Sequence, residues 1–271
     1  MNTFIKKFKT LIHLDWKWAR KYYSKKAKTY FLYYVSLLLG RKYLSGTVDG
    51  IEIKLCFFTP YHHLIAYGIH KGKQEPWMML MWKKAAENNN VIYDIGGYNG
   101  IFGLVAAKAN PNATVIIFEP SKINAEHIRQ NIKLNNLQNC SLQQMAVSDK
   151  KGIVSFSSKK TQGTADHITY ITKGEEKNDD GVESIDLDSL STVPDLIKID
   201  AEGAEFSILK GAEKTLSRKP QILLEVHPHY LEKYGVREED LWSLLRNKKY
   251  GWWFLDSTSD LTSHYLVYPK N

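Results

Sequence analysis

The sequence predicts an α/β protein built on a mostly parallel sheet with helices on both faces. From residue 91 onward, short apolar segments alternate with helical ones, the rhythm of parallel strands joined by crossover helices. Residues 91–109 have the order strand, glycine turn, helix, which lets backbone N–H groups approach a ligand closely. Four polar residues follow successive apolar segments: Asp94, Glu119, Asp200 and His227. Because ligands of such sheets bind beyond the carboxyl ends of the strands, these residues predict a site there.

Composition and charge narrow the classes of protein that the chain can belong to. Its 271 residues, 43% of them hydrophobic and 24% charged, suit one large α/β domain with an appendage. The net charge of +8 is concentrated in residues 1–28, so the remainder is neutral overall. A nucleic-acid-binding core would carry a broad basic face, so we expect no nucleic-acid partner. Cys56 and Cys140 are far apart in the sequence and indicate neither a disulfide framework nor a zinc site.

We expect three regions along the chain. Residues 1–46 form a helical N-terminal arm, 47–90 lead into the core, and 91–271 form the main domain. Within the arm, residues 1–28 have apolar side chains at three- and four-residue spacing with lysines between them, which predicts a basic amphipathic helix. Such a helix either lies on an anionic membrane surface or packs on its own domain. The apolar segment 30–39 is too short to span a bilayer, so we expect a cytoplasmic protein, with or without peripheral attachment to the inner face of a membrane.

Two elements are expected ahead of the core. Residues 47–58 alternate around Asp49-Gly50, which predicts a β-hairpin. Residues 72–90 predict a helix with Pro76 near its first turn.

The core elements follow from hydrophobic periodicity and from their flanking turns. We expect strands at 91–93, 114–118, 141–145, 196–199 and 221–226, and helices at 101–109, 123–135, 206–215 and 239–246. Segments 252–255 and 264–268 are expected to close the sheet as an antiparallel pair. The span 157–181 contains a polar, charged stretch and is a candidate lid or substrate loop.

The glycine turn indicates what kind of ligand it receives. Asp94 opens the turn, and a carboxylate there would repel a pyrophosphate but would suit a ligand with a positive charge, such as the amino group of S-adenosylmethionine. Glycines at 96, 97 and 100 do not have the dinucleotide spacing, because Tyr98 stands where the second glycine belongs. An ordinary turn between a strand and a helix is the alternative.

The next two strand ends offer further cofactor contacts. Glu119 can accept hydrogen bonds from both ribose hydroxyls of an adenosyl group, because a carboxylate has two oxygens; the alternative is a charge that favours the following helix N-terminus. Met145 and Ala146 end the third strand, where an adenine ring would lie, and Met145 serves either the ring or the core. Asp149 or a backbone group could meet the adenine amine.

An acidic segment and a histidine follow the fourth and fifth strands. Lys198 and Asp200 are two residues apart in the fourth strand and therefore point to the same face of the sheet. Glu202 lies in the turn that follows, so several carboxylates are close together there and repel one another unless a cation or a donor meets them. These groups could hold the methionine end of the cofactor, the hydroxyls of an acceptor, or a divalent ion. Glu225 and His227 share a face of the neighbouring strand. His227 is a general base, a structural core histidine, or a metal ligand together with the acids.

The motifs together resemble the FkbM family of S-adenosylmethionine-dependent methyltransferases, over roughly residues 70–269. The resemblance is carried by Asp-Ile-Gly-Gly-Tyr-Asn-Gly at 94–100, Phe-Glu-Pro at 118–120, Ala-Val-Ser-Asp at 146–149, Ile-Asp-Leu-Asp-Ser-Leu at 185–190, Ile-Lys-Ile-Asp-Ala-Glu-Gly-Ala-Glu at 197–205 and Leu-Glu-Val-His-Pro at 224–228. A Gln-Glu-Pro segment at 74–76 resembles a short element that the family carries ahead of its glycine turn.

The resemblance implies a class I methyltransferase fold, which is Rossmann-like, and O-methylation of a hydroxyl on a sugar, glycan or glycolipid. The cofactor-binding candidates are Glu75, Asp94, Gly96, Gly97, Asn99, Gly100, Glu119, Pro120, Met145 and Ala146. The catalytic candidates are Lys198, Asp200 and His227, and the substrate-binding candidates are Glu202 and Glu225. The family usually has Ala-Asn after its first glycine, whereas here Asn99 comes one position late, so the partner of the methionine carboxylate stays open.

The expected activity is therefore methyl transfer from S-adenosylmethionine to a hydroxyl of a sugar, glycan or glycolipid. A divalent metal is an open addition to the cofactor. Three alternatives remain. One is an adenosyl-binding scaffold protein without turnover, and another is a nicotinamide-dependent oxidoreductase, which Asp94 and the glycine spacing disfavour. The third is an RNA methyltransferase, disfavoured by the neutral core.

Overall fold

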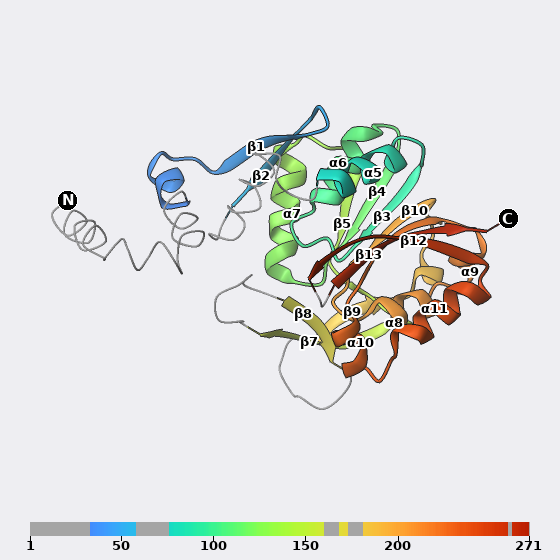
Figure 1. Cartoon of the computed structure of the whole chain (residues 1–271). Coiled ribbons are helices and arrows are strands. Elements are labelled where there is room, and N and C mark those ends of the chain that lie inside the picture. The colour runs from blue at the N-terminus through green and yellow to red at the C-terminus, as the bar shows by residue number, and fades with distance from the viewer. Residues whose placement is uncertain (1–32, 58–75, 160–167, 173–180, 260–261, 271) are drawn as a thin grey trace, which may run out of the picture.

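A computed structural model describes residues 33–57, 76–159, 168–172, 181–259 and 262–270. Its central element is a seven-stranded sheet (Figure 1). In spatial order the strands are β5 (Cys140–Gln143), β4 (Thr114–Phe118), β3 (Val91–Ile95), β10 (Leu196–Ile199), β11 (Gln221–Val226), β13 (Thr262–Pro269) and β12 (Tyr250–Ser259). The first five are parallel, and β13 and β12 form an antiparallel pair at one edge. This doubly wound order confirms the class I methyltransferase fold that the sequence predicts.

Helices cover both faces of the sheet because successive strand residues point to opposite sides. One face carries α5 (Pro76–Ala86), α6 (Ile101–Ala109) and α7 (Lys122–Leu134), and the other α8 (Glu205–Lys210), α9 (Glu213–Ser217), α10 (Pro228–Lys233) and α11 (Glu238–Asn247). In β3, Ile92 packs into the first core and Tyr93 into the second. Both residues are fully buried, so two hydrophobic layers hold the sheet.

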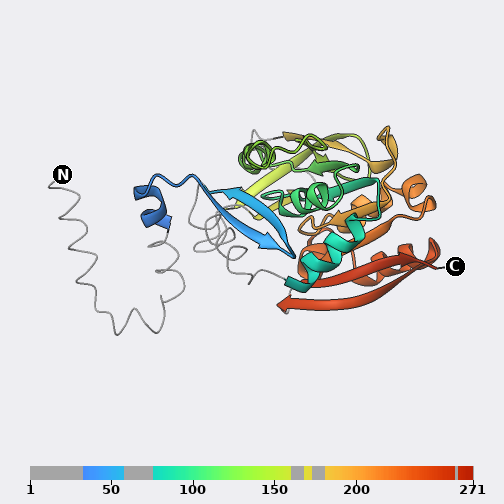
Figure 2. The same ribbon diagram turned by 90° about the horizontal axis from the view of Figure 1, so that it is seen from above.

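The predicted hairpin is present and lies against the helices of the first face (Figure 2). It consists of β1 (Tyr43–Val48) and β2 (Ile51–Cys56), joined by Asp49 and Gly50, both at positive φ. The side-chain oxygen of Asn131 in α7 accepts the Cys56 N–H at 2.8 Å, and Asn135 bonds the backbone of β2 in the same way. The two side-chain amides thus form hydrogen bonds with backbone groups at the edge of β2 that would otherwise be unpaired.

One predicted helix is wrong in its continuity. The sequence predicts a single helix over 206–215, whereas the structure has α8 and α9 separated at Gly211. A side chain at Gly211 would meet the backbone of Ser148 and lie 2.8 Å from the α-carbon of Asp149. Glycine at this position therefore allows the segment at Ser148 and Asp149 to pack directly against the backbone. This contact is tertiary, so local helix propensity does not predict it. The helix α10, which begins at Pro228 directly after His227, was not expected.

A second sheet replaces part of the expected loop at 157–181. Its order is β6 (Ala146–Val147), β9 (Gly181–Ile185), β7 (Gly152–Lys159) and β8 (Ile168–Thr172). The strand β5 ends two residues before Met145, so the expected strand at 141–145 is too long. A short 3-10 helix (Leu187–Ser189) follows β9. The strands β7, β8 and β9 contain strand-forming residues, but polar and charged stretches at 160–167 and 173–180 interrupt them, so the span as a whole has the composition of a loop.

Two expectations fall outside the described residues. These are the amphipathic helix over 1–28 and the cofactor candidate Glu75. The expected helix at 72–90 is described from Pro76 onward. Within the ranges that the structure describes, no helix combines the length and the apolar character needed to cross a bilayer.

Candidate active site

The glycine turn is held tightly between the ends of three strands. The N–H groups of Gly96 and Gly97 donate to the carbonyl oxygen of Phe118 at 3.0 and 3.1 Å, which ties the turn to the end of β4. Gly96 has φ of 78°, and a Cβ there would overlap the carbonyl oxygen of Asp200 beyond β10. Gly100 has φ of 81° and precedes the first residue of α6. Glycine at 96 therefore brings the predicted cofactor turn into backbone contact with the acidic segment.

Asp94 lies one residue deeper than the sequence suggests. The strand β3 continues to Ile95, so Asp94 is part of the strand and not of the turn. Its side chain is fully buried, with Oδ2 accepting the Gly103 N–H of α6 at 2.9 Å and Oδ1 4.0 Å from the Lys198 Nζ. Burial raises the pKa of this carboxyl above its usual range. The placement of Asp94 inside the turn is thus wrong, and its carboxylate supports the turn from beneath.

Glu119 follows β4 and fastens the turn by its side chain. Its two carboxylate oxygens accept the N–H groups of Tyr98 and Ser121, each at 2.8 Å. Tyr98 has φ of 52°, so Glu119 stabilises a residue in the left-handed region. Burial raises the pKa of Glu119 to about 7, against the opposing effect of these hydrogen bonds. Oε1 also accepts a longer bond from the Asn124 amide at 3.5 Å, whereas Oε2 retains a lone pair that can accept a ribose hydroxyl. Pro120 lies directly after it, at the start of the segment that caps α7 through Ser121.

The other cofactor candidates occupy the rim of the same region. The Asn99 side-chain oxygen accepts the N–H of Ile101 at 3.1 Å and so stabilises the turn that leads into α6. Met145 lies between β5 and β6 and is partly buried against the second hydrophobic core. Core packing was one of the two roles expected for it. Ala146 begins β6 and is buried. Asp149 faces Lys210, with the carboxylate and ammonium 3.4 Å apart.

Lys198 is a buried cation shared by two carboxylates. Its Nζ lies 3.0 Å from Oδ2 of Asp200 and 4.0 Å from Oδ1 of Asp94, and 4.6 Å from the centre of the Phe102 ring. Burial alone would lower the pKa of Lys198, but the neighbouring carboxylates outweigh it and raise that pKa above its usual range. Lys198 therefore stays protonated and positions Asp200, and it does not act as a base.

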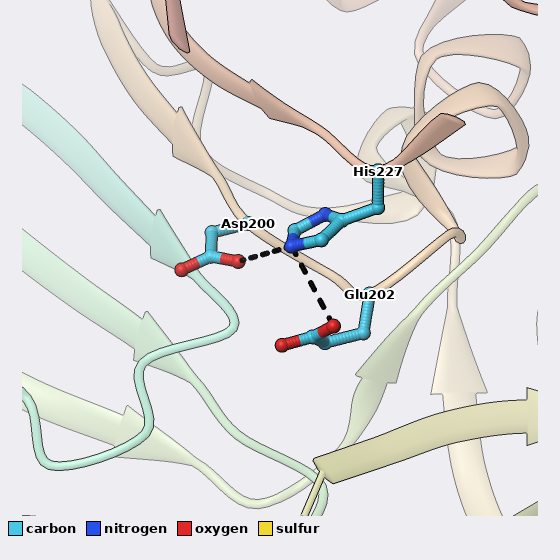
Figure 3. Close-up of side chains that lie close together, drawn as sticks. All are labelled: Asp200, Glu202 and His227. Atoms are coloured by element: carbon cyan, nitrogen blue, oxygen red, sulfur yellow. Dashed lines mark ion pairs between the residues drawn. The ribbon is translucent and has the colours of Figure 1, made fainter. Parts of the chain in front are cut away.

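His227 lies among four carboxylates, two of which are drawn with it in Figure 3. Its Nδ1 is hydrogen-bonded to Oε1 of the fully buried Glu205 at 2.9 Å. Its Nε2 points to the other side, 3.5 Å from Oε2 of Glu202, 3.6 Å from Oε1 of Glu225 and 3.9 Å from Oδ1 of Asp200. The structure thus brings together the residues predicted from two separate strands.

The surrounding charges change what His227 can do. Burial would lower its pKa, but the Glu205 hydrogen bond and the charge of Asp200 outweigh burial and raise it to about 10. At neutral pH the imidazole then carries a proton, so this arrangement does not support His227 as the general base. Burial and the neighbouring carboxylates Asp200 and Glu225 raise the pKa of Glu202 to about 7, although His227 opposes them. Glu202 also has φ of 48°, a strained backbone at the centre of the cluster.

Sequence reasoning missed the roles of three residues. Glu205 is visible in the sequence as one acid of the turn, but its contact with His227 spans 22 residues and has no local signature. His264 lies opposite Glu225 in the pairing of β13 with β11, and its Nε2 is 3.2 Å from that carboxylate. The Phe102 ring faces Lys198 from the first turn of α6. Only strand pairing and helix docking place these side chains.

The donor set of the site fits S-adenosylmethionine better than a dinucleotide. The N–H groups at positions 96, 97, 98 and 100 are all engaged within the protein, which leaves no row of donors for a pyrophosphate. The polar groups at the strand ends are mainly carboxylates, and in the described residues Lys198 and His227 are paired with them. Such a rim accepts hydroxyls and attracts a positively charged ligand. Glu119 and the turn at 96–100 would hold the cofactor.

Comparison with known proteins finds the following similarities. Hexuronic acid methyltransferase AglP of Haloferax volcanii is 24% identical over 181 residues, which cover 66% of this chain and 70% of that protein. The crystal structure of methyltransferase FkbM from Methylobacillus flagellatus is similar with a TM-score of 0.48 at 15% identity, covering 76% of this chain and 54% of that one, so this chain spans about half of it. TYW2 from M. jannaschii, solved with S-adenosylmethionine, has a TM-score of 0.41 at 15% identity and covers 83% and 84% of the two chains.

The matching family is decisive because it covers the glycine turn, the acidic segment and His227 together. Residues 94–251, more than half of the chain, match the methyltransferase FkbM domain. The chain therefore belongs to the FkbM family and is an S-adenosylmethionine-dependent methyltransferase.

Proposed function

We propose that the protein transfers the methyl group of S-adenosylmethionine to a hydroxyl oxygen of a sugar. The observation that carries this proposal is the contact between the cofactor turn and the acidic cluster. At Gly96 the turn approaches the Asp200 carbonyl so closely that no Cβ fits between them. A methyl donor held by the turn and an acceptor held by the cluster would therefore be neighbours, which is what direct transfer requires.

The acidic cluster suits a ligand that is rich in hydroxyl groups. Carboxylates accept hydrogen bonds from hydroxyls, and Asp200, Glu202 and Glu225 converge beyond two adjacent strands. Lys198 fixes Asp200 from below through a 3.0 Å ion pair. A hexuronic acid methyltransferase among the relatives also favours a sugar acceptor.

The chemical step places modest demands on the protein. The bound cofactor supplies a methyl group on a positively charged sulfur, which is already an activated donor. The protein has to orient the acceptor hydroxyl and to take up the proton that this hydroxyl loses. The carboxylates around His227 can accept that proton. His227, held by Glu205, orients Glu202 and Asp200.

The test is an acceptor screen with S-adenosylmethionine that carries a labelled methyl group. Neutral glycosides, hexuronic acids, lipid-linked sugars and RNA serve as acceptors, and mass spectrometry locates the methyl ether. We expect labelled product from a sugar together with release of S-adenosylhomocysteine. Glu119→Gln should weaken cofactor binding about tenfold and slow turnover at limiting cofactor, while Glu126→Gln, at an exposed carboxylate on α7, should do neither. Label found only on RNA, or bound cofactor without any product, would overturn the proposal.

We further propose that residues 1–28 attach the enzyme to the inner face of an anionic membrane, where lipid-linked sugars would be within reach. The support is the concentration of the chain's positive charge in that segment. The full-length protein should sediment with vesicles that contain phosphatidylserine, and less so as salt increases. If a variant that lacks residues 1–28 binds the vesicles equally well, the segment has no such role.

A further inference from the structure

The three side chains in Figure 3 have the geometry of a metal-binding site. Asp200, Glu202 and His227 can each present one ligand atom, and these atoms lie within 4.8 Å of one another. The His227 Nε2 is 3.5 Å from the Glu202 carboxylate and 3.9 Å from that of Asp200. Both separations exceed the usual N–H···O distance of about 2.9 Å. They match ligands that share one ion, since bonds of about 2.1 Å at right angles or wider place two ligand atoms at least about 3 Å apart.

A second observation concerns the orientation of His227. Only 4% of the residue is exposed, and its Nε2 makes no hydrogen bond with any residue that the structure describes. On the opposite side of the ring, Nδ1 is bonded to the buried Glu205 carboxylate at 2.9 Å. With Nδ1–H donated to Glu205, Nε2 is directed into the cluster, and its lone pair becomes available when an ion displaces the Nε2 proton. A carboxylate behind the imidazole is the arrangement that orients histidine ligands in metal sites.

The carboxylates of the cluster are also arranged as separate ligands. Asp200 uses Oδ2 for Lys198 and turns Oδ1 toward His227, so each oxygen has its own partner. Glu202 makes no hydrogen bond within the described residues, and its side chain is 31% exposed. It is therefore free to bind an ion and open to solvent on the side from which an ion and an acceptor would enter.

The charge balance requires a further cation. Five carboxylates surround the strand ends, and they belong to Asp94, Asp200, Glu202, Glu205 and Glu225. In the described residues, Lys198 and the protonated His227 are the positive charges among them, fewer than the carboxylates. Like charges at this distance are costly when partly buried, and a divalent ion relieves that repulsion.

We propose that Asp200, Glu202 and His227 bind a divalent cation of the Mg²⁺ or Mn²⁺ type, positioned by Glu205, and that this ion holds the acceptor hydroxyl. Two carboxylates balance its charge, the imidazole binds as the neutral ligand after releasing its Nε2 proton to solvent, and three ligands leave coordination positions for water or a hydroxyl. The role at the acceptor rests on the proposed methyl transfer, whereas binding of the ion does not.

The experiment measures Mn²⁺ binding to the full chain directly, after removal of metals with a chelator. Electron paramagnetic resonance counts free Mn²⁺ as the protein is titrated, with and without S-adenosylhomocysteine. We expect one ion per chain and at least tenfold weaker binding in Glu202→Gln, equal to about 1.4 kcal/mol. The matched control Glu126→Gln should bind as the wild type does. Spin-echo modulation from an imidazole nitrogen should be present in the wild type and absent in His227→Gln.

Two further readouts separate this inference from the proposed function. Glu202→Gln should retain S-adenosylhomocysteine binding, which shows that its site is folded, so a loss of Mn²⁺ then reports the ligand itself. Saturable Mn²⁺ binding with no methyl transfer to any acceptor would support the ion site and refute the proposed function. Mn²⁺ binding that Glu202→Gln leaves unchanged would overturn the ion site. Methyl transfer that proceeds at full rate in chelator would overturn the ion's role at the acceptor. Either result leaves the proposed function standing.

Discussion

Substitution of Gly96 tests the contact between the cofactor turn and the acidic segment. In Gly96→Ala the new Cβ would overlap the carbonyl oxygen of Asp200 and lie 2.8 Å from its carbonyl carbon. Because these are backbone atoms, a side-chain rotation cannot relieve the overlap. The left-handed φ of 78° costs an alanine about 1–2 kcal/mol, and forced displacement of packed atoms typically costs about 1–3 kcal/mol more. We therefore expect a loss of about 2–5 kcal/mol in the free energy of unfolding.

Gly50 provides the matched control. It has a similar φ of 83°, but a Cβ there would meet nothing within 4 Å. Gly50→Ala should therefore lower the free energy of unfolding only by the cost of a left-handed φ in alanine, about 1–2 kcal/mol. Urea denaturation followed by circular dichroism compares the two variants, and calorimetry measures S-adenosylhomocysteine binding. We expect at least tenfold weaker binding in Gly96→Ala and unchanged binding in Gly50→Ala. Equal losses of stability in both variants, with normal binding, would refute the argument that close approach fixes glycine at 96.

Three further predictions follow from single contacts. Raising the pH from 6 to 8 should strengthen S-adenosylhomocysteine binding by up to about tenfold. The reason is that Glu119, with a pKa of about 7, becomes an ionised acceptor for the ribose hydroxyls. A pH dependence of binding that persists unchanged in Glu119→Gln would contradict this. Lys198→Met should destabilise the fold by about 3–5 kcal/mol, because it leaves Asp94 and Asp200 without their cation, and Lys83→Met, at the surface ion pair with Asp49, should have a smaller effect in the same denaturation assay. Asp188→Ala should cost about 1–2 kcal/mol without changing cofactor binding, because Asp188 accepts the N–H groups of Lys214 and Thr215 at the start of α9; equal stability to wild type would show that this cap contributes nothing.

Much of the fold is predictable because it depends on local pattern. The strands at 114–118, 196–199 and 221–226 and the helix at 101–109 begin and end as the sequence indicates. Each is an apolar run bounded by glycine, proline or polar residues, and that signal needs no knowledge of the rest of the chain. The second sheet was missed because β7, β8 and β9 are short strand-forming segments separated by long polar stretches, and only their pairing in space identifies them as one sheet.

The composition of the candidate site was largely predictable, but its contacts were not. Acids and a histidine at strand ends identify Glu119, Asp200, Glu202 and His227 as members of a site. The sequence leaves open whether His227 is a base, a structural residue or a ligand. That choice depends on its distances to carboxylates from two strand ends and a helix, and on the buried Glu205 behind it.

The sequence by itself determined the parallel α/β order, the turn at 94–100 and the types of side chain that gather at the strand ends. It does so because hydrophobic periodicity and glycine positions act on neighbouring residues. Only the tertiary structure decided that Asp94 is buried beneath the turn, that Lys198 joins two carboxylates, and that Gly211 divides a helix. These features arise where segments distant in the chain are packed together, so that burial and the partner's charge, and not local propensity, fix what each side chain does.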